Sequence, residues 1–205
     1  MTPVKVLAVR YLQNVSPGLA HALGTDARCL AMLTTDCDDA TYIALDAATK
    51  AASALVCYAR SFYAGASNAS QPYAGEVIGI LGAATPGDAR SAMEAALSAL
   101  KELGFTEYNG VSYLAHTVSS AGSFLSQEAG VPLGSALAYL IAPPLESVYG
   151  LDAALKAADV RLCRLYAPPS QTNFGGGLLT GTQSACTAAC QAFAQAVEEV
   201  ARFPK

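Results

Sequence analysis

The sequence predicts an α+β fold that occurs twice in tandem, with helices packed on mainly antiparallel sheets. The first observation is an internal repeat, because LDAATKAA at 45–52 returns as LDAALKAA at 151–158, a shift of 106 positions. Cys57 and Cys163 keep the same shift. The second observation is that strand and helix patterns mix without strict alternation, which favours an α+β arrangement. A doubly wound parallel sheet is the alternative.

A chance likeness between two alanine-rich helices is the other explanation of the repeat. The flanking segments argue against it, since LAML at 30–33 matches LAYL at 137–140 once one gap is allowed. A strand pattern therefore recurs together with the helix pattern. We interpret the chain as a tandem duplication with a first domain over 1–105 and a second over 106–205.

The first elements of the first repeat have clear boundary signals. Residues 4–12 alternate like a strand, and residues 29–34 form a short apolar run. Ser16 and Pro17 are typical of the start of a helix, which extends to Leu23 and ends at Gly24. Residues 38–54 have helical period, with acidic residues in the first turn, where the positive end of the helix favours them.

The rest of the first repeat predicts two strands and a helix. The strands cover 54–60 and 76–81 and are separated by a loop rich in Gly, Ser, Asn and Pro. The helix covers 86–103, with Thr85 as its cap and Gly104 as its end. The second repeat follows the same order up to a final helix over 183–202.

Charge and hydropathy exclude two classes of partner. Twelve basic and 16 acidic residues give a net charge of −4, without the basic excess that nucleic-acid binding requires. The mean hydropathy is +0.33, yet no window approaches the roughly 18 apolar residues that span a bilayer. We therefore expect neither a nucleic acid nor a membrane as a partner.

The start of the chain lacks the pattern of a secretory signal, so we expect a cytoplasmic protein whose six cysteines are reduced. Only 14% of the residues are charged, whereas soluble globular chains average about 25%. Too few charges remain to cover an ordinary surface. We infer broad protein–protein contact, in an oligomer or an array.

The candidate catalytic and metal-binding residues are few. His21 and His116 are the two histidines, and no G-x-S-x-G motif accompanies them, so both are interpreted as structural. Cys186 and Cys190 lie four apart on one helical face, without the second pair that a zinc site needs. We expect no metal, no cofactor and no enzymatic activity.

Three glycines at 175–177 precede the last helix. Backbone N–H groups in such a segment can cradle a phosphate, but the Lys-Ser/Thr of a P-loop does not follow. The alternative is a flexible or tightly approaching loop, which can face a symmetry axis.

Acidic residues stand out at two places. Asp36, Asp38 and Asp39 resemble a calcium loop but lack its central glycine and its final glutamate, so helix capping by Asp38 or Asp39 is the alternative. Glu76 opens an apolar strand, where a carboxylate needs water or a partner. If the helix start lies beside Glu76, the carboxylates can hold a small cation such as an amine.

Long motifs resemble one family over nearly the whole chain, the EutL-type tandem-domain shell proteins of ethanolamine-utilisation bacterial microcompartments. The motifs are DCDDATY at 36–42, YARSFYAGA at 58–66, AGEV at 74–77, YLIAPPLE at 139–146, LDAALKAADV at 151–160 and PPSQTNF at 168–174. The resemblance implies two circularly permuted microcompartment shell domains per chain. It also implies a homotrimer that forms a pseudohexameric disc and tiles with other shell proteins around the microcompartment. Such a protein is not catalytic.

The resemblance further implies a ligand site and a gated central pore that passes small molecules. The ligand is ethanolamine, and the matching positions are the helix start at Asp38 and Asp39, above all Asp39, with Glu76 and the backbone of Phe105. The gate corresponds to the loops at 62–75 and 168–177. Its expected residues are Phe62, Tyr63, Asn68, Tyr73, Thr172, Asn173, Phe174, Gly175 and Gly176. The three glycines depart from the family pattern, so the resemblance does not decide whether the gate is open or closed at rest.

A second hypothesis keeps the amine site without the shell. In that case the chain is a soluble small-amine-binding or sensory protein that uses Asp39 and Glu76. Assembly separates the two hypotheses, because a shell protein forms trimers and sheets whereas a sensor stays a small discrete species.

Overall fold

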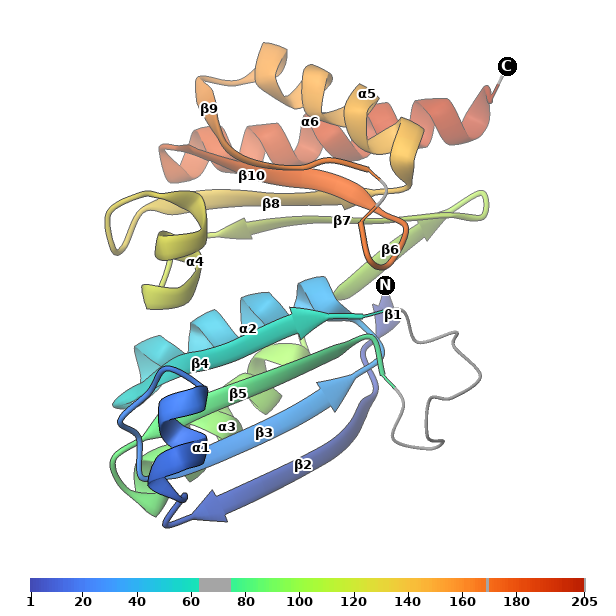
Figure 1. Ribbon diagram of the computed structural model, residues 1–205. Helices are drawn as coiled ribbons and strands as arrows, with labels where there is room; N and C mark the ends of the chain where they lie inside the picture. The colour runs from blue at the N-terminus through green and yellow to red at the C-terminus, as the bar shows by residue number, and fades with distance from the viewer. Residues whose placement is uncertain (63–74, 169, 205) are drawn as a thin grey trace. The chain divides into compact units, whose positions relative to one another are not determined.

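The computed structural model describes residues 1–62, 75–168 and 170–204. The chain divides into two compact units (Figure 1). Unit 1 comprises Met1–Thr2, Gly104–Ala121 and Leu125–Lys205. Unit 2 comprises Pro3–Leu103 and Gly122–Phe124, so a short segment from the second half of the sequence belongs to the unit that is built mainly from the first half.

Unit 2 is a four-stranded antiparallel sheet with two long helices on it. Its strands are β2 (Val6–Gln13), β3 (Cys29–Thr35), β4 (Ala54–Ser61) and β5 (Val77–Ala83), and its helices are α1 (Pro17–Ala22), α2 (Asp38–Ala51) and α3 (Pro86–Leu100). The strand order is β2-β3-β5-β4, and each neighbouring pair is antiparallel. Helices α2 and α3 pack against each other and against the sheet, as Figure 1 shows.

Unit 1 contains the remaining elements, except that Pro3 of β1 and Ser123–Phe124 at the start of α4 belong to unit 2. Its strands are β1 (Thr2–Pro3), β6 (Gly104–Tyr108), β7 (Val111–Val118), β8 (Ala136–Ala142), β9 (Val160–Tyr166) and β10 (Gly175–Gly181), and its helices are α4 (Ser123–Ala129), α5 (Pro144–Ala157) and α6 (Gln183–Arg202). The sheet order is β1-β6-β7-β8-β10-β9. Helices α5 and α6 pack together on this sheet (Figure 1).

The two sheets share one topology. The run β7-β8-β10-β9 repeats the order β2-β3-β5-β4 element for element, and its pairs are also antiparallel. This confirms the predicted α+β class and the tandem duplication. The doubly wound parallel sheet is wrong, because every neighbouring pair of strands in these two runs is antiparallel.

Small residues let the helices approach the sheet closely. A Cβ atom added at Gly150 would lie 2.7 Å from the Phe193 ring, so α5 and α6 meet where α5 has no side chain. Cys186 and Cys190 are both buried in this core, at 0% and 7% exposure. Their place on α6 is that of small packing residues, as predicted.

Two predicted helix ends are wrong for the same reason, the early start of the next strand. The helix predicted to residue 54 ends at Ala51, because Ala54 already pairs in β4. The helix predicted to residue 103 ends at Leu100, and Gly104 opens β6 instead of terminating the helix. Gly104 has φ 159°, and a Cβ atom there would lie 2.1 Å from the Thr2 carbonyl oxygen.

The three glycines are not a loop. Gly175, Gly176 and Gly177 open β10, where they pair with β8 on one side and, for the last two, with β9 on the other. A Cβ atom at Gly176 would lie 1.9 Å from the Leu140 carbonyl oxygen. The tight approach that the sequence suggested is therefore correct, and the flexible loop is wrong.

We expect Gly176→Ala to lower the free energy of unfolding by about 2 kcal/mol or more, because the methyl group collides with fixed sheet backbone at a φ of 155°. Gly87→Ala is the matched control. A Cβ atom at Gly87 meets only the Thr85 hydroxyl at 3.7 Å, in the first turn of α3. Thermal and urea unfolding should place this control within about 0.5 kcal/mol of the wild type. Equal stability of both variants would contradict the packing argument.

Candidate functional site

The candidate site lies in unit 2, where β3 ends and α2 begins. Threonine hydroxyls hold this turn, because Thr35 Oγ1 accepts from the Cys37 N–H at 3.2 Å and lies 2.7 Å from Thr41 Oγ1. Cys37 is the N-cap and makes no side-chain cap bond. Capping by Asp38 or Asp39 is therefore wrong, since both lie inside the first turn of α2.

Two carboxylates of this first turn are almost fully buried. Asp38 and Asp39 are each 6% exposed, and the Asp39 N–H donates to Asp38 Oδ1 at 2.9 Å. Asp36, just before the helix, is exposed and accepts from the Lys5 N–H at 2.7 Å. The positive end of the α2 dipole partly offsets the negative charge that gathers here.

Backbone pairing brings Glu76 to the same place. The Glu76 N–H donates to the Thr35 carbonyl at 2.8 Å, and its carbonyl accepts from the Phe62 N–H at 2.8 Å. Gly75 makes this approach possible, because a Cβ atom there would lie 2.2 Å from the Thr35 carbonyl oxygen. The structure thus supplies the proximity of Glu76 to the helix start that the sequence left open.

Burial and neighbouring negative charge both act on this acidic cluster (Asp36, Asp38, Asp39 and Glu76). Burial raises the pKa of Glu76 to about 7, and the negative charges of Asp38 and Asp36 raise it further in the same direction. Burial also raises the pKa of Tyr42 to about 12, with further contributions from the negative charges of Asp38 and Asp39. A bound cation would reverse these shifts, so the cluster favours a cationic ligand.

The remaining residues predicted for the ligand and the gate divide between the units. Phe105 lies on β6 of unit 1, whereas the carboxylates lie in unit 2. Phe62 follows β4 and is 37% exposed. The predicted gate residues Tyr63, Asn68 and Tyr73 lie outside the described residues.

The second predicted gate segment is a tight turn between β9 and β10. The Ser170 N–H donates to the Phe174 carbonyl at 2.8 Å, and Asn173 has a positive φ of 66°. Thr172 is held within the turn, since its N–H donates to Ser170 Oγ at 3.4 Å. The Phe174 ring meets the Phe105 ring edge-on, with centroids 5.2 Å apart. Gly175 and Gly176 follow in paired strand β10, so their predicted place in a loop is wrong.

The potential metal ligands do not cluster within the described ranges. No group of three or more His, Cys, Asp or Glu side chains there is arranged to hold a metal ion. All six cysteines are free thiols. None of the helices in the described part of the chain combines the length and the hydropathy that crossing a bilayer requires.

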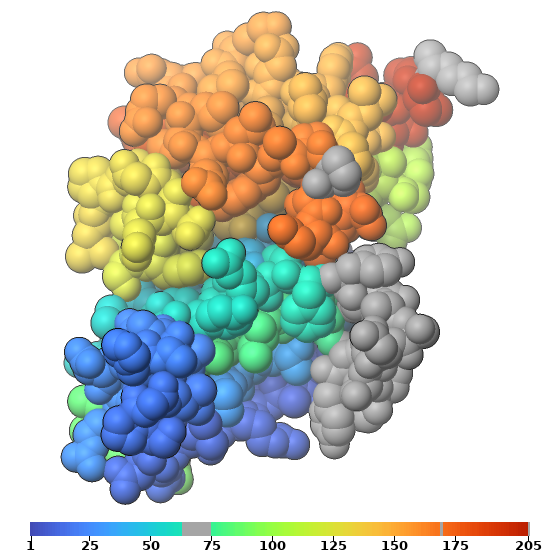
Figure 2. Space-filling view, in the orientation of Figure 1, coloured from blue at the N-terminus to red at the C-terminus, as the bar shows by residue number. Residues whose placement is uncertain are grey.

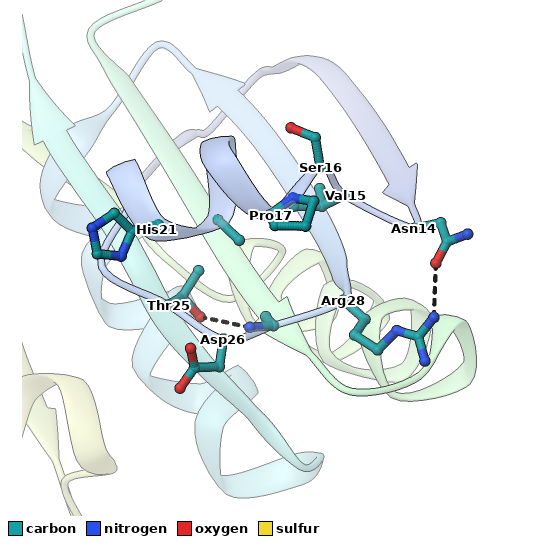
Figure 3. Close-up of a pocket in the computed structure, with 10 residues that line it drawn as sticks. Asn14, Val15, Ser16, Pro17, His21, Thr25, Asp26 and Arg28 are labelled. Carbon is teal, nitrogen blue, oxygen red and sulfur yellow. Dashed lines mark hydrogen bonds between the residues drawn. The ribbon is translucent and has the colours of Figure 1, made fainter.

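The structure also contains a surface pocket that the sequence did not predict. Its volume is about 420 Å³, and it lies beside α1 (Figure 3). His21, Asp26 and Arg28 line it, with Arg28 donating to Asn14 Oδ1 at 2.9 Å. No motif marks these residues, because the β2–β3 connection brings them together only in three dimensions.

Comparison with known proteins defines the class. A scan against protein-family models finds no match. The bacterial microcompartment shell protein EutL of Clostridium perfringens (strain 13 / Type A) is 55% identical over 205 residues, which cover 97% of this chain and 94% of that protein. The crystal structure of EutL from Clostridium perfringens has a TM-score of 0.94 at 54% identity, covering 98% of this chain and 94% of that one.

A crystal structure of the ethanolamine utilization protein EutL from Leptotrichia buccalis gives the same result. Its TM-score is 0.94 at 54% identity, over 99% of this chain and 96% of that one. The repeated antiparallel unit is thus the fold of a bacterial microcompartment shell protein. Within that class, the chain belongs to the EutL family. The resemblance seen in the sequence motifs is confirmed.

The raised pKa of Glu76 predicts a loss of stability as the pH rises. Between its ordinary value of 4.5 and about 7, the folded chain keeps a proton that the unfolded chain has released. The free energy of unfolding therefore falls across this interval. Glu76→Gln removes the effect, so the variant should match the wild type at pH 4. At pH 8 the free energy of unfolding of the variant should exceed that of the wild type by about 1 kcal/mol. This figure is reduced for solvent screening, because the Glu76 side chain is only half-buried.

Urea unfolding at a series of pH values, without any amine in the buffer, measures this difference. Glu107→Gln is the matched control, because it removes the same charge from an exposed position on β6. A pH-independent difference between Glu76→Gln and the wild type would contradict the electrostatic account.

Proposed function

We propose that three copies of the chain form a pseudohexameric disc that tiles, with other shell proteins, into the microcompartment shell. Each half of the chain, 1–105 and 106–205, supplies one circularly permuted shell domain. The observation that carries this proposal is the repeated strand order β2-β3-β5-β4 and β7-β8-β10-β9, which lets three chains present six equivalent sheets. The low content of charged residues, 14%, supports extensive contact between copies.

We propose that the acidic cluster binds ethanolamine. The support is the convergence of Asp38 and Asp39, each 6% exposed, with Glu76, whose pKa is raised by burial and by its acidic neighbours. An ammonium group between these carboxylates makes charge-assisted hydrogen bonds and relieves their repulsion. Phe105 stays a proposed ligand through its backbone, as the family resemblance implies.

We propose that the disc has a gated central pore and that the 170–174 turn is part of the gate. The packing of Phe174 on Phe105, at 5.2 Å between ring centroids, supports a physical link between the proposed ligand residue and the gate turn. A pore protein of this kind is selective through its lining and needs no catalytic group. The relatives are named as shell proteins, which accords with a structural role.

The oligomeric state tests the shell assignment. Sedimentation velocity and light scattering should give a mass three times the 21.0 kDa of the chain, and concentrated protein should form flat sheets in electron micrographs. A trimer forms because the exposed apolar surface of a single chain gains from burial. A monomer at all concentrations would favour the alternative of a soluble amine-binding or sensory protein.

Ethanolamine binding should depend on pH, because the ligand must displace a proton from Glu76 below pH 7. We expect the dissociation constant to rise up to tenfold per pH unit as the pH falls below about 7, and to level off above it. Glu76→Gln should weaken binding at least tenfold and abolish this dependence. Isothermal titration measures both effects.

Two controls make the binding test specific. Glu107→Gln should bind ethanolamine as the wild type does, since Glu107 lies exposed in unit 1. Ethylene glycol, which has a hydroxyl in place of the ammonium, should not bind. Equal binding of ethanolamine by the wild type and Glu76→Gln would overturn the amine assignment and leave the shell role intact.

A further inference from the structure

We propose that the exposed face of α5 is covered by the segment Ser16–Gly18 of a second copy of this chain. The contact is head-to-tail and repeats, between chains, the contact that α2 makes with Gly122–Phe124 inside unit 2. It rests on the proposed trimer and assigns the residues through which the copies join.

The contact inside unit 2 has three components. Asp46 Oδ2 accepts from the Gly122 N–H at 2.7 Å, and Thr49 Oγ1 accepts from the Ser123 N–H at 3.1 Å. The Tyr42 and Phe124 rings pack with centroids 5.9 Å apart. Together they bury the outer face of α2, where Asp46 is 0% exposed.

The equivalent face of α5 is exposed in the part of the chain that the structure describes. Leu145, Val148, Tyr149 and Leu155 are 69%, 54%, 49% and 37% exposed. The side chain of Asp152, which stands 106 positions after Asp46, is 62% exposed. Residues 145, 148, 152 and 155 follow helical spacing, so they form one continuous face. Helices with apolar residues along an outer face are typical of interfaces.

The repeat also identifies the segment that corresponds to Gly122–Phe124. Helix α4 begins at Ser123 and α1 at Pro17, which is again a shift of 106. Both helices are followed by a glycine of positive φ, at 62° for Gly130 and 68° for Gly24. Ser16–Gly18 therefore occupies the equivalent place, and its three residues are exposed at the start of α1. Figure 2 shows the N-terminal part of the chain, in blue, at the surface, and Figure 3 labels Ser16 and Pro17.

The two faces have changed together in a way that keeps them complementary. At the positions related by the shift of 106, Leu155 stands for Thr49 and Pro17 stands for Ser123. The hydroxyl acceptor and the N–H donor are therefore both absent, so the proposed contact leaves neither of them unpaired. The Asp46 and Gly122 pair becomes Asp152 and Ser16, which keeps a carboxylate and a backbone N–H.

The third pair follows the same pattern. Tyr42 and Phe124 become Val148 and Gly18, so both partners are smaller and no overlap arises. The same i,i+4 ion pair accompanies each aspartate, with Lys50 beside Asp46 and Lys156 beside Asp152. Because α5 and Ser16–Gly18 are different surfaces, their contact is heterologous and closes only in a ring of copies.

Val148→Asp tests the face by placing an unpaired charge in the proposed contact. We expect at least a hundredfold rise in the dissociation constant of the trimer in sedimentation velocity, with an unchanged far-UV circular dichroism spectrum. Phe203→Asp is the matched control, because Phe203 is 66% exposed and follows the end of α6 instead of lying on α5. A stable trimer from Val148→Asp would overturn the proposal.

Disulfide capture tests the direction of the contact without relying on destabilisation. Ser16→Cys and Asp152→Cys chains, coexpressed and mildly oxidised, should give a covalent dimer that neither single variant gives alone. Dimers from Asp152→Cys alone would show α5 against α5 and overturn the head-to-tail contact. If the wild type is a trimer but the two coexpressed variants do not cross-link, only the interface is refuted. If the wild type is a monomer, the proposed shell function is refuted as well.

Discussion

The hydrogen bond from the Gly122 N–H to the buried carboxylate of Asp46 is the interaction on which the organisation of the chain depends. It is 2.7 Å long, and Asp46 is 0% exposed. Hydrogen bonds to charged groups contribute about 1.5–3 kcal/mol, and an unpaired buried carboxylate would cost more. Gly122 leaves no room for a side chain, because a Cβ atom would lie 2.6 Å from the Asp46 carbonyl oxygen. Together with the Thr49–Ser123 hydrogen bond and the Tyr42–Phe124 ring contact, this bond holds Gly122–Phe124 in unit 2.

Because the domain is duplicated, the environment of Asp46 can be compared with that of its equivalent in the second repeat, Asp152. Asp152 has kept the carboxylate and its lysine but has not been buried by its own chain. A duplicated domain in a ring meets one neighbour through its own chain and the next through another copy. Differences between equivalent positions, such as Thr49 and Leu155, then reflect which partner each face meets. In the ring that we propose, the low charge content and the exposed apolar residues of α5 have a common cause.

The acidic cluster is a second place where the fold accepts an electrostatic cost. Two aspartates lie in the first turn of α2, and backbone pairing forces Glu76 beside them. Burial raises the pKa of Glu76, and the negative charges of Asp38 and Asp36, which the helix dipole offsets only in part, raise it further. Groups held in unfavourable ionisation states often mark ligand sites, since the ligand supplies the missing compensation. An amine supplies that compensation as a positive charge.

The sequence by itself determined the elements and their repetition. Local signals sufficed for the Thr85 cap and the full extent of α6, because caps and helical period depend on neighbours in the chain. The sequence also singled out Glu76, since an acid opening an apolar strand is a local anomaly. Only the tertiary structure decided that Gly175 and Gly176 lie in a paired strand, and that Gly104 serves the approach of β1. It also decided that Glu76 lies near enough to Asp38 for the two charges to interact. The physical reason is that close backbone approach and charge proximity are set by strand register between distant segments, which local patterns do not encode.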